Sequence, residues 1–218
     1  MRMAGSGRKV RVAVNVMRAR LTMLGFNLAI ITFQNSQAKL FQGGIKLSGF
    51  RDVIHLGTGT VLVCAAALSL AAMAVFLASA IIDENGLCEP YCLLAGDLLM
   101  YLALSQTVIG YFGPYLDAIS GEVLPDAASS VLLGRIGLAM QVLGGTVWCL
   151  VAYAGPIVAL LRSPCSRPMM VLLMLVYLVS LVAIGQFWTI ARIVEATPSG
   201  PGLPSYNLLA PLVAPLYW

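Results

Sequence analysis

Four long apolar runs limit what this chain can fold into more than any other feature. They cover approximately residues 57–82, 92–116, 131–161 and 169–191, and each exceeds the roughly 20 predominantly apolar residues that a membrane helix needs. The chain is 60% hydrophobic and 10% charged, whereas soluble domains average about 45–50% apolar and about 25% charged residues. One soluble core of this size could not bury so much apolar surface. We therefore predict an all-α integral membrane protein.

Short connections between the apolar runs make neighbours in sequence antiparallel neighbours in space. We expect four transmembrane helices in an up-down bundle over residues 51–195, a basic N-terminal arm over 1–50 and a Pro-rich tail over 196–218. Prolines at this density exclude a helix in the tail; they are Pro198, Pro201, Pro204, Pro211 and Pro215. The residues between them are apolar, so we expect the tail to lie on protein or at the level of the lipid headgroups.

The N-terminal arm carries a helical pattern of its own. Its apolar residues recur at intervals of three and four, at Val10, Val14, Met17, Leu21, Leu24, Leu28 and Ile31, which is the spacing of one helix face. Polar residues such as Arg18, Asn27 and Gln34 fall largely off that stripe. The uninterrupted apolar part, LTMLGFNLAIITF, is too short to span a bilayer. We therefore predict an amphipathic helix that lies at the membrane interface or against a partner.

Basic residues are concentrated in the same arm. Nine of the thirteen Lys and Arg lie in residues 1–51, and the first acidic residue is Asp52. With four spans, the side that holds the arm would carry all but Arg162 and Arg167, which places it in the cytoplasm or the mitochondrial matrix. Such an arm suits a bilayer with anionic headgroups as its partner. The pattern does not distinguish a mitochondrial inner membrane from a plasma membrane, and nothing in it indicates a nucleic-acid partner.

Residues with catalytic chemistry are sparse in this sequence. His55 is the single histidine, and we find no zinc motif, phosphate-binding glycine loop or nucleophile elbow. We therefore expect no catalytic, cofactor or metal site, although a bound lipid is compatible with the composition. Among the polar residues within the predicted spans, the candidates for a role inside the membrane are Asp97, Gln106, Gln141 and Gln186. Interhelical hydrogen bonding is their usual role, with a pore mouth as the alternative for Asp97, and Asp117 could pair with Arg135 across the second loop.

Three cysteines fall in loops on the side opposite the arm: Cys88, Cys92 and Cys165. Thiols outside the cytoplasm oxidise, so a disulfide among these three is one interpretation. Thiol-disulfide catalysis is another, but Cys88 and Cys92 have C-x-x-x-C spacing instead of the C-x-x-C of redox enzymes.

Small residues form the most regular stripe in the first apolar run. They are Thr60, Cys64, Ala67, Ala71, Ala74 and Ala78, spaced four and three apart. Membrane helices associate through close packing at small residues, so we predict that this stripe is a helix-packing face. The glycine-rich run 131–161 is its expected partner within the chain, and another protein is the alternative.

Taken together, these features favour a non-catalytic multi-pass membrane protein that serves as a structural or accessory subunit of a larger complex. A small homo-oligomeric channel or transport protein is the first alternative. A redox protein that uses the loop cysteines is the second.

Overall fold

The computed structural model describes residues 6–37, 44–46, 53–84, 90–121, 127–196 and 210–216. Its regular elements are all helical across these ranges. They are α1 (Ser6–Gln37), α2 (Leu56–Glu84), α3 (Pro90–Gly121), α4 (Ala127–Cys149), the π-helix η2 (Leu150–Ala154), α5 (Gly155–Arg162), α6 (Arg167–Ala196) and the 3-10 turns η3 (Ala210–Leu212) and η4 (Ala214–Leu216). The prediction of an all-helical chain is confirmed for this part of the protein.

Five stretches, one more than predicted, are long and apolar enough to cross a membrane. Four of them match the predicted runs, and the fifth is Val16–Gln37 in the N-terminal arm. The apolar run LTMLGFNLAIITF, which is bounded by Arg20 and Gln34, is too short to span a membrane by itself. The helix continues through both residues, because their side chains are accommodated by neighbouring helices. The predicted count of four spans is therefore not confirmed.

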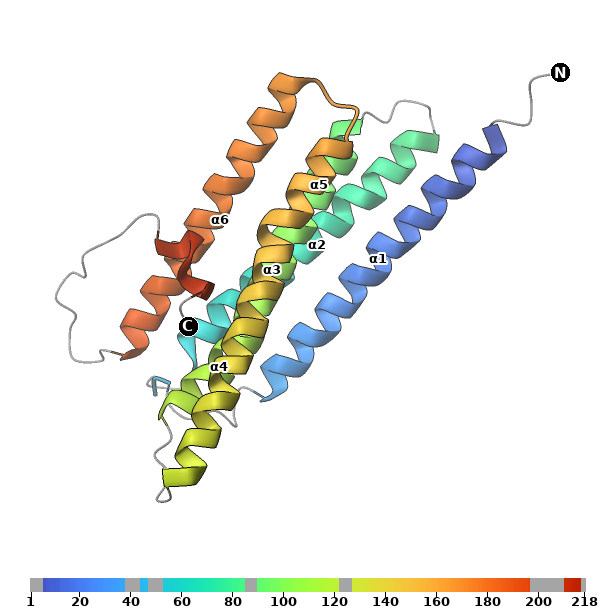
Figure 1. Ribbon diagram of the computed structural model, residues 1–218. Helices are drawn as coiled ribbons and strands as arrows, with labels where there is room; N and C mark the ends of the chain where they lie inside the picture. The colour runs from blue at the N-terminus through green and yellow to red at the C-terminus, as the bar shows by residue number, and fades with distance from the viewer. Residues whose placement is uncertain are drawn as a thin grey trace.

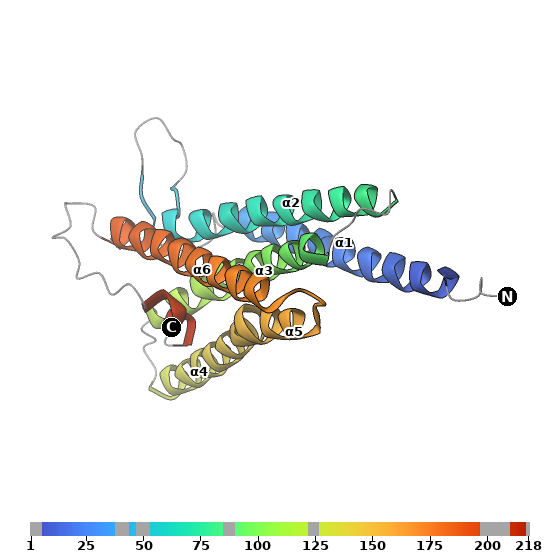
Figure 2. The same ribbon diagram turned by 90° about the horizontal axis from the view of Figure 1, so that it is seen from above.

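Helix α3 occupies the centre of the molecule and contacts α1, α2, α4, η2, α5 and α6. In Figure 2, α1 and α2 lie on one side of it and α4 and α5 on the other, while α6 packs against both α2 and α3. Successive helices run in opposite directions, as Figure 1 shows for α1, α2 and α3. The rod formed by α4, η2 and α5 runs back along α3, and α6 returns towards the first residues of α2.

Glycines allow large side chains from neighbouring helices to lie directly on a backbone. A Cβ at Gly96 of α3 would come within 2.5 Å of the Phe76 ring, and a Cβ at Gly155 would come within 2.4 Å of the Tyr101 ring. Both distances are shorter than any normal carbon–carbon contact. Close packing at small residues drives helix association in lipid, so Gly96 and Gly155 are among the positions that let α2 and α5 approach α3 closely.

The π-helix η2 precedes Pro156, the second residue of α5. Proline has no N–H and its ring clashes with the carbonyl four residues earlier, which here belongs to Ala152. The backbone responds with a wider turn in which the Gly155 N–H donates to the Leu150 carbonyl. The buried Tyr177 hydroxyl of α6 donates to the Ala152 carbonyl at 2.8 Å. Tyr177 therefore satisfies the acceptor that Pro156 leaves without its helical donor.

Tyr177→Phe is expected to lower the free energy of unfolding by about 1–3 kcal/mol, because it leaves the buried Ala152 carbonyl without a donor. An added Pro156→Ala change supplies a new N–H for that carbonyl, so the cost of Tyr177→Phe should fall in this second background. The unmodified chain, the two single variants and the double variant are unfolded in a mild detergent by titration with a denaturing detergent. The cost of Tyr177→Phe is then compared with and without Pro156→Ala. Equal costs in both backgrounds would show that Tyr177 does not act through Pro156.

The described part of the tail, residues 210–216, lies on protein between α4 and α6. Turn η3 packs against α6, and η4 packs against α4. The Tyr153 hydroxyl donates to the Leu212 carbonyl at 2.6 Å, and the Pro215 carbonyl lies 3.2 Å from the position of a Cβ at Gly145. The tail therefore connects two helices that diverge from one another.

Candidate functional site

Three polar residues of α1 point towards the other helices. Arg20, Asn27 and Gln34 recur every seven residues, with the buried Leu24 and Ile31 between them. Asn27 is 1% exposed and Gln34 is 0% exposed, whereas Phe26 and Phe33 are 68% and 56% exposed. We call Arg20, Asn27 and Gln34, with their partners on α2 and α3, the polar seam.

Each seam residue has a partner on a neighbouring helix. Arg20 Nη2 donates to Asp97 Oδ2 of α3 at 2.5 Å. Asn27 Nδ2 donates to the Ser69 hydroxyl of α2 at 2.9 Å, and Gln34 Nε2 lies 3.4 Å from the Gly110 carbonyl of α3. The guanidinium of Arg20 also lies 5.3 Å from the centre of the Phe76 ring of α2.

The arrangement of the polar seam differs from the one expected of an amphipathic helix at the membrane interface. An interfacial helix turns its polar residues to water and its apolar residues to the membrane. Here Arg20, Asn27 and Gln34 face the helix bundle, and the exposed side chains of α1 include Phe26, Ile30 and Phe33 together with polar ones such as Arg18 and Asn35. In lipid, an ionised side chain at a helix centre costs about 2.5–3.5 kcal/mol, so such residues face a bundle interior and pair with one another. Arg20 and Asp97 satisfy that requirement mutually.

The four polar residues predicted within the spans are not brought together. Asp97 is paired with Arg20, so it does not stand alone at a pore mouth. Gln106 of α3 is buried, and its Nε2 lies 3.4 Å from the Ser105 hydroxyl. Gln141 lines a cavity beside α4, and Gln186 is half-buried on α6. Sequence reasoning missed Arg20 as a site residue because it was counted with the basic arm.

The stripe of small residues on α2 is largely on the outer surface. Thr60 and Cys64 are half-buried, and Ala67, Ala71, Ala74 and Ala78 are exposed. The buried face of α2 is formed by other residues, which include Val61, Ala65, Ser69, Ala72 and Phe76. The expected pairing of α2 with α4 is wrong, because α3 lies between them (Figure 2). We call Ala67, Ala71, Ala74 and Ala78 the outer alanine face.

The cysteines show no pairing in the part of the chain that the structure describes. Cys64, Cys92, Cys149 and Cys165 are free thiols, and Cys88 lies outside the described residues. The predicted disulfide is thus not formed between Cys92 and Cys165. Within the same residues, no group of three or more His, Cys, Asp or Glu side chains could hold a metal ion.

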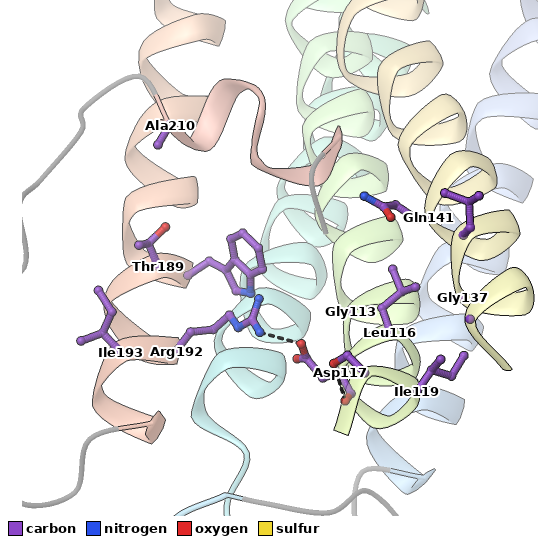
Figure 3. A pocket seen from close by; sticks show the side chains of 14 residues that line it. Gly113, Leu116, Asp117, Ile119, Gly137, Gln141, Thr189, Arg192, Ile193 and Ala210 are labelled. Atoms are coloured by element: carbon purple, nitrogen blue, oxygen red, sulfur yellow. Dashed lines mark hydrogen bonds and ion pairs between the residues drawn. The ribbon is translucent and has the colours of Figure 1, made fainter. Parts of the chain in front are cut away.

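A cavity of about 830 Å³ lies between α3, α4 and α6, with Ala210 of the tail at its edge. Figure 3 shows Asp117 and Arg192 in contact on its wall, with Gln141 on α4. The Arg192 guanidinium stacks on the Trp188 ring, 5.3 Å from its centre. A second hollow of about 840 Å³ shares Leu138 and Gln141 with the first and follows α4, η2 and the start of α5 as far as Ile157.

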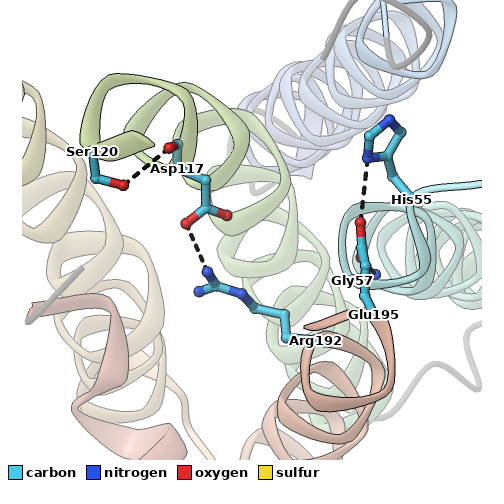
Figure 4. Close-up of polar contacts among 6 residues, drawn as sticks. All are labelled: His55, Gly57, Asp117, Ser120, Arg192 and Glu195. Carbon is cyan, nitrogen blue, oxygen red and sulfur yellow. Dashed lines mark hydrogen bonds and ion pairs between the residues drawn. The ribbon is translucent and has the colours of Figure 1, made fainter. Parts of the chain in front are cut away.

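Two sets of polar contacts join the ends of α2, α3 and α6 near this cavity (Figure 4). Arg192 Nη2 lies 2.6 Å from Asp117 Oδ1. The Glu195 carboxylate accepts the Gly57 N–H at 2.9 Å and lies 3.3 Å from His55 Nδ1. It thereby satisfies a free N–H at the start of α2 and complements the positive end of the helix dipole. The predicted pairing of Asp117 with Arg135 is wrong: Asp117 pairs with Arg192, and Arg135 is exposed.

No family model, curated protein or solved structure matches this chain. Its function is therefore inferred from its own geometry.

Proposed function

We propose that this chain is a five-span membrane protein in which α1 is an integral helix of the bundle. The polar seam supports this topology, because Arg20, Asn27 and Gln34 find their partners on α2 and α3 instead of in water. Five spans put the two ends of the chain on opposite sides of the membrane. Eight Lys and Arg would then share the side of the N-terminus and five the other side. That difference is too small to orient the protein by its positive charge.

Within that topology, we propose that the protein is a non-catalytic structural or accessory subunit of a larger membrane complex. One observation carries this proposal: the outer alanine face of α2 points away from the rest of the chain. A helix that meets only lipid gains nothing from small side chains, whereas small side chains allow a second helix to approach closely. The polar seam supports the same function, because its residues contact neighbouring helices, and the buried Ser105, Gln106 and Thr107 form hydrogen bonds within α3.

The test is a bulky substitution on the outer alanine face. Ala71→Trp or Ala74→Trp should separate the protein from its neighbours, so that native electrophoresis after mild solubilisation shows a smaller particle. Val179→Trp is the matched control, because Val179 is 68% exposed on α6 and should tolerate tryptophan. Mass spectrometry of the native band identifies its subunits.

Two results would contradict the accessory-subunit proposal. A native band that contains copies of this chain alone would favour the homo-oligomeric channel. A band that is unchanged by both alanine substitutions would show that the outer alanine face meets lipid.

A further inference from the structure

The cavity between α3, α4 and α6 contains an acid and a base side by side. Asp117 and Arg192 form its charged wall, and their side chains are 56% and 46% exposed. Both groups therefore remain accessible to a ligand that enters the cavity. A ligand that carries a negative and a positive charge a few atoms apart would match this pair without leaving either residue uncompensated.

The charged wall lies close to the ends of two candidate spans. Asp117 is three residues from the end of Tyr91–Ser120, and Arg192 is three residues from the end of Arg167–Glu195. Trp188 stacks on Arg192 one turn further into α6. Tryptophan beside arginine at a span end is typical of the headgroup level of a bilayer. A ligand that binds Asp117 and Arg192 should therefore have its charged groups at the headgroup level of the bilayer.

An apolar path leads from the charged wall along α4 and continues along η2 to the start of α5. The second hollow meets the cavity at Leu138 and Gln141 and is lined further on by Val142, Leu150 and Ile157, with Leu216 of the tail beside them. At 1.5 Å per residue, the path from Leu138 to Ile157 is roughly 28 Å long. An acyl chain of one leaflet needs about half of a hydrocarbon core that is about 30 Å thick. The path is therefore long enough for one lipid tail.

We propose that this crevice, defined by the cavity and the hollow along α4, selectively holds one phospholipid whose headgroup carries a phosphate and an amine. The phosphate accepts hydrogen bonds from Arg192, the ammonium group binds Asp117, and one acyl chain follows α4 beneath the tail. Gln141, at the junction of the two hollows, is placed to donate to the glycerol ester region. This inference rests on the proposed membrane insertion of the helices.

Native mass spectrometry of the detergent-solubilised full chain tests the proposal. Phosphatidylethanolamine and phosphatidylglycerol are added at equal concentration, and single-lipid adducts are counted. We expect the amine lipid to be preferred about fivefold, the ratio that one modest charge pair gives. Asp117→Asn should abolish the preference, and Arg192→Gln should reduce retention of both lipids. Arg167→Gln is the matched control, because Arg167 is an exposed arginine at the other end of α6.

Two further experiments distinguish binding of a whole lipid from binding of its headgroup chemistry alone. Glycerophosphoethanolamine and inorganic phosphate present the headgroup chemistry without acyl chains, and neither should compete at lipid concentrations that saturate the crevice. Gly134→Leu places a side chain in the cavity, where a Cβ meets nothing within 4 Å, and should exclude the lipid while both charges remain.

Retention that is equal for both lipids, or that is unchanged in Arg192→Gln and Gly134→Leu, would show ordinary annular lipid and overturn the proposal. Competition by inorganic phosphate would assign the site to a soluble anion. Side-specific labelling of single cysteines at Ser6 and Ser166 reports the five-span topology separately, so loss of lipid selectivity with intact topology contradicts this inference alone.

Discussion

Asp97→Leu is expected to release α1 from the bundle. The substitution leaves the Arg20 guanidinium without the carboxylate that it contacts at 2.5 Å. Removing one partner of a fully buried pair typically costs about 3–5 kcal/mol, because the remaining charge is uncompensated, and this pair, at 21% and 14% exposed, should approach the lower end of that range. The other two contacts of the polar seam are neutral hydrogen bonds, worth about 0.6–2 kcal/mol each in membranes, and cannot offset that loss. The N-terminal residues should then become protease-sensitive while the other helices stay folded.

Limited proteolysis in detergent, with the cut sites found by mass spectrometry, measures this release. A double variant, Arg20→Leu with Asp97→Leu, should restore much of the protection, because replacing both charges removes the unpaired one. Asp117→Leu is the control for loss of a carboxylate: its partner Arg192 is exposed, so the stability cost should be about 1 kcal/mol or less. If Asp97→Leu leaves α1 as protected as before, the ion pair does not hold this helix in place.

Gly96→Ala is expected to give the second large effect. The added methyl group would lie 2.5 Å from Cε1 of Phe76, whose ring is fully buried and carries Arg20 on its face. Overpacking of this kind typically costs about 1–3 kcal/mol. The ring must move for the methyl group to fit, so the change should also weaken the Arg20–Asp97 pair next to it. A lower free energy of unfolding and faster proteolysis of α1 should appear together.

Gly113→Ala is the matched control for Gly96→Ala, because it lies in the same helix and its Cβ would meet nothing within 4 Å. It should be neutral or stabilising by up to about 1 kcal/mol through helix propensity. Phe76→Leu removes the obstructing ring, so Gly96→Ala should cost less in that background. Equal effects of alanine at Gly96 and Gly113 would contradict the close contact of Phe76 with α3.

The long apolar runs predicted the helices α2, α3 and α6 and the rod of α4, η2 and α5, because continuous apolarity over such lengths leaves few other folds. The sequence was less informative for α1. Arg20, Asn27 and Gln34 mark one helix face, but a polar face turns outward in water and inward in lipid. The sequence shows the seven-residue spacing of these polar residues. Whether their face turns inward depends on partners far along the chain, such as Asp97.

The outer alanine face illustrates a second limit of sequence reasoning. The stripe at Ala67, Ala71, Ala74 and Ala78 is regular, yet the buried face also contains small residues, among them Ala65 and Ala72. Regular spacing therefore identified a continuous face and left open what covers it. The cavity beside Asp117 was equally hidden, because its lining combines residues from α3, α4, α6 and the tail.

Side-specific labelling of single cysteines tests the central claim, that α1 is a fifth membrane span, most directly. In a chain without its native cysteines, Ser6→Cys, Lys46→Cys, Ser120→Cys and Ser166→Cys are labelled one at a time with a membrane-impermeant maleimide in sealed vesicles. Five spans predict that position 6 reacts from the same side as position 166, and that positions 46 and 120 react from the other. Reaction of position 6 together with positions 46 and 120 would contradict the claim and restore the interfacial arm.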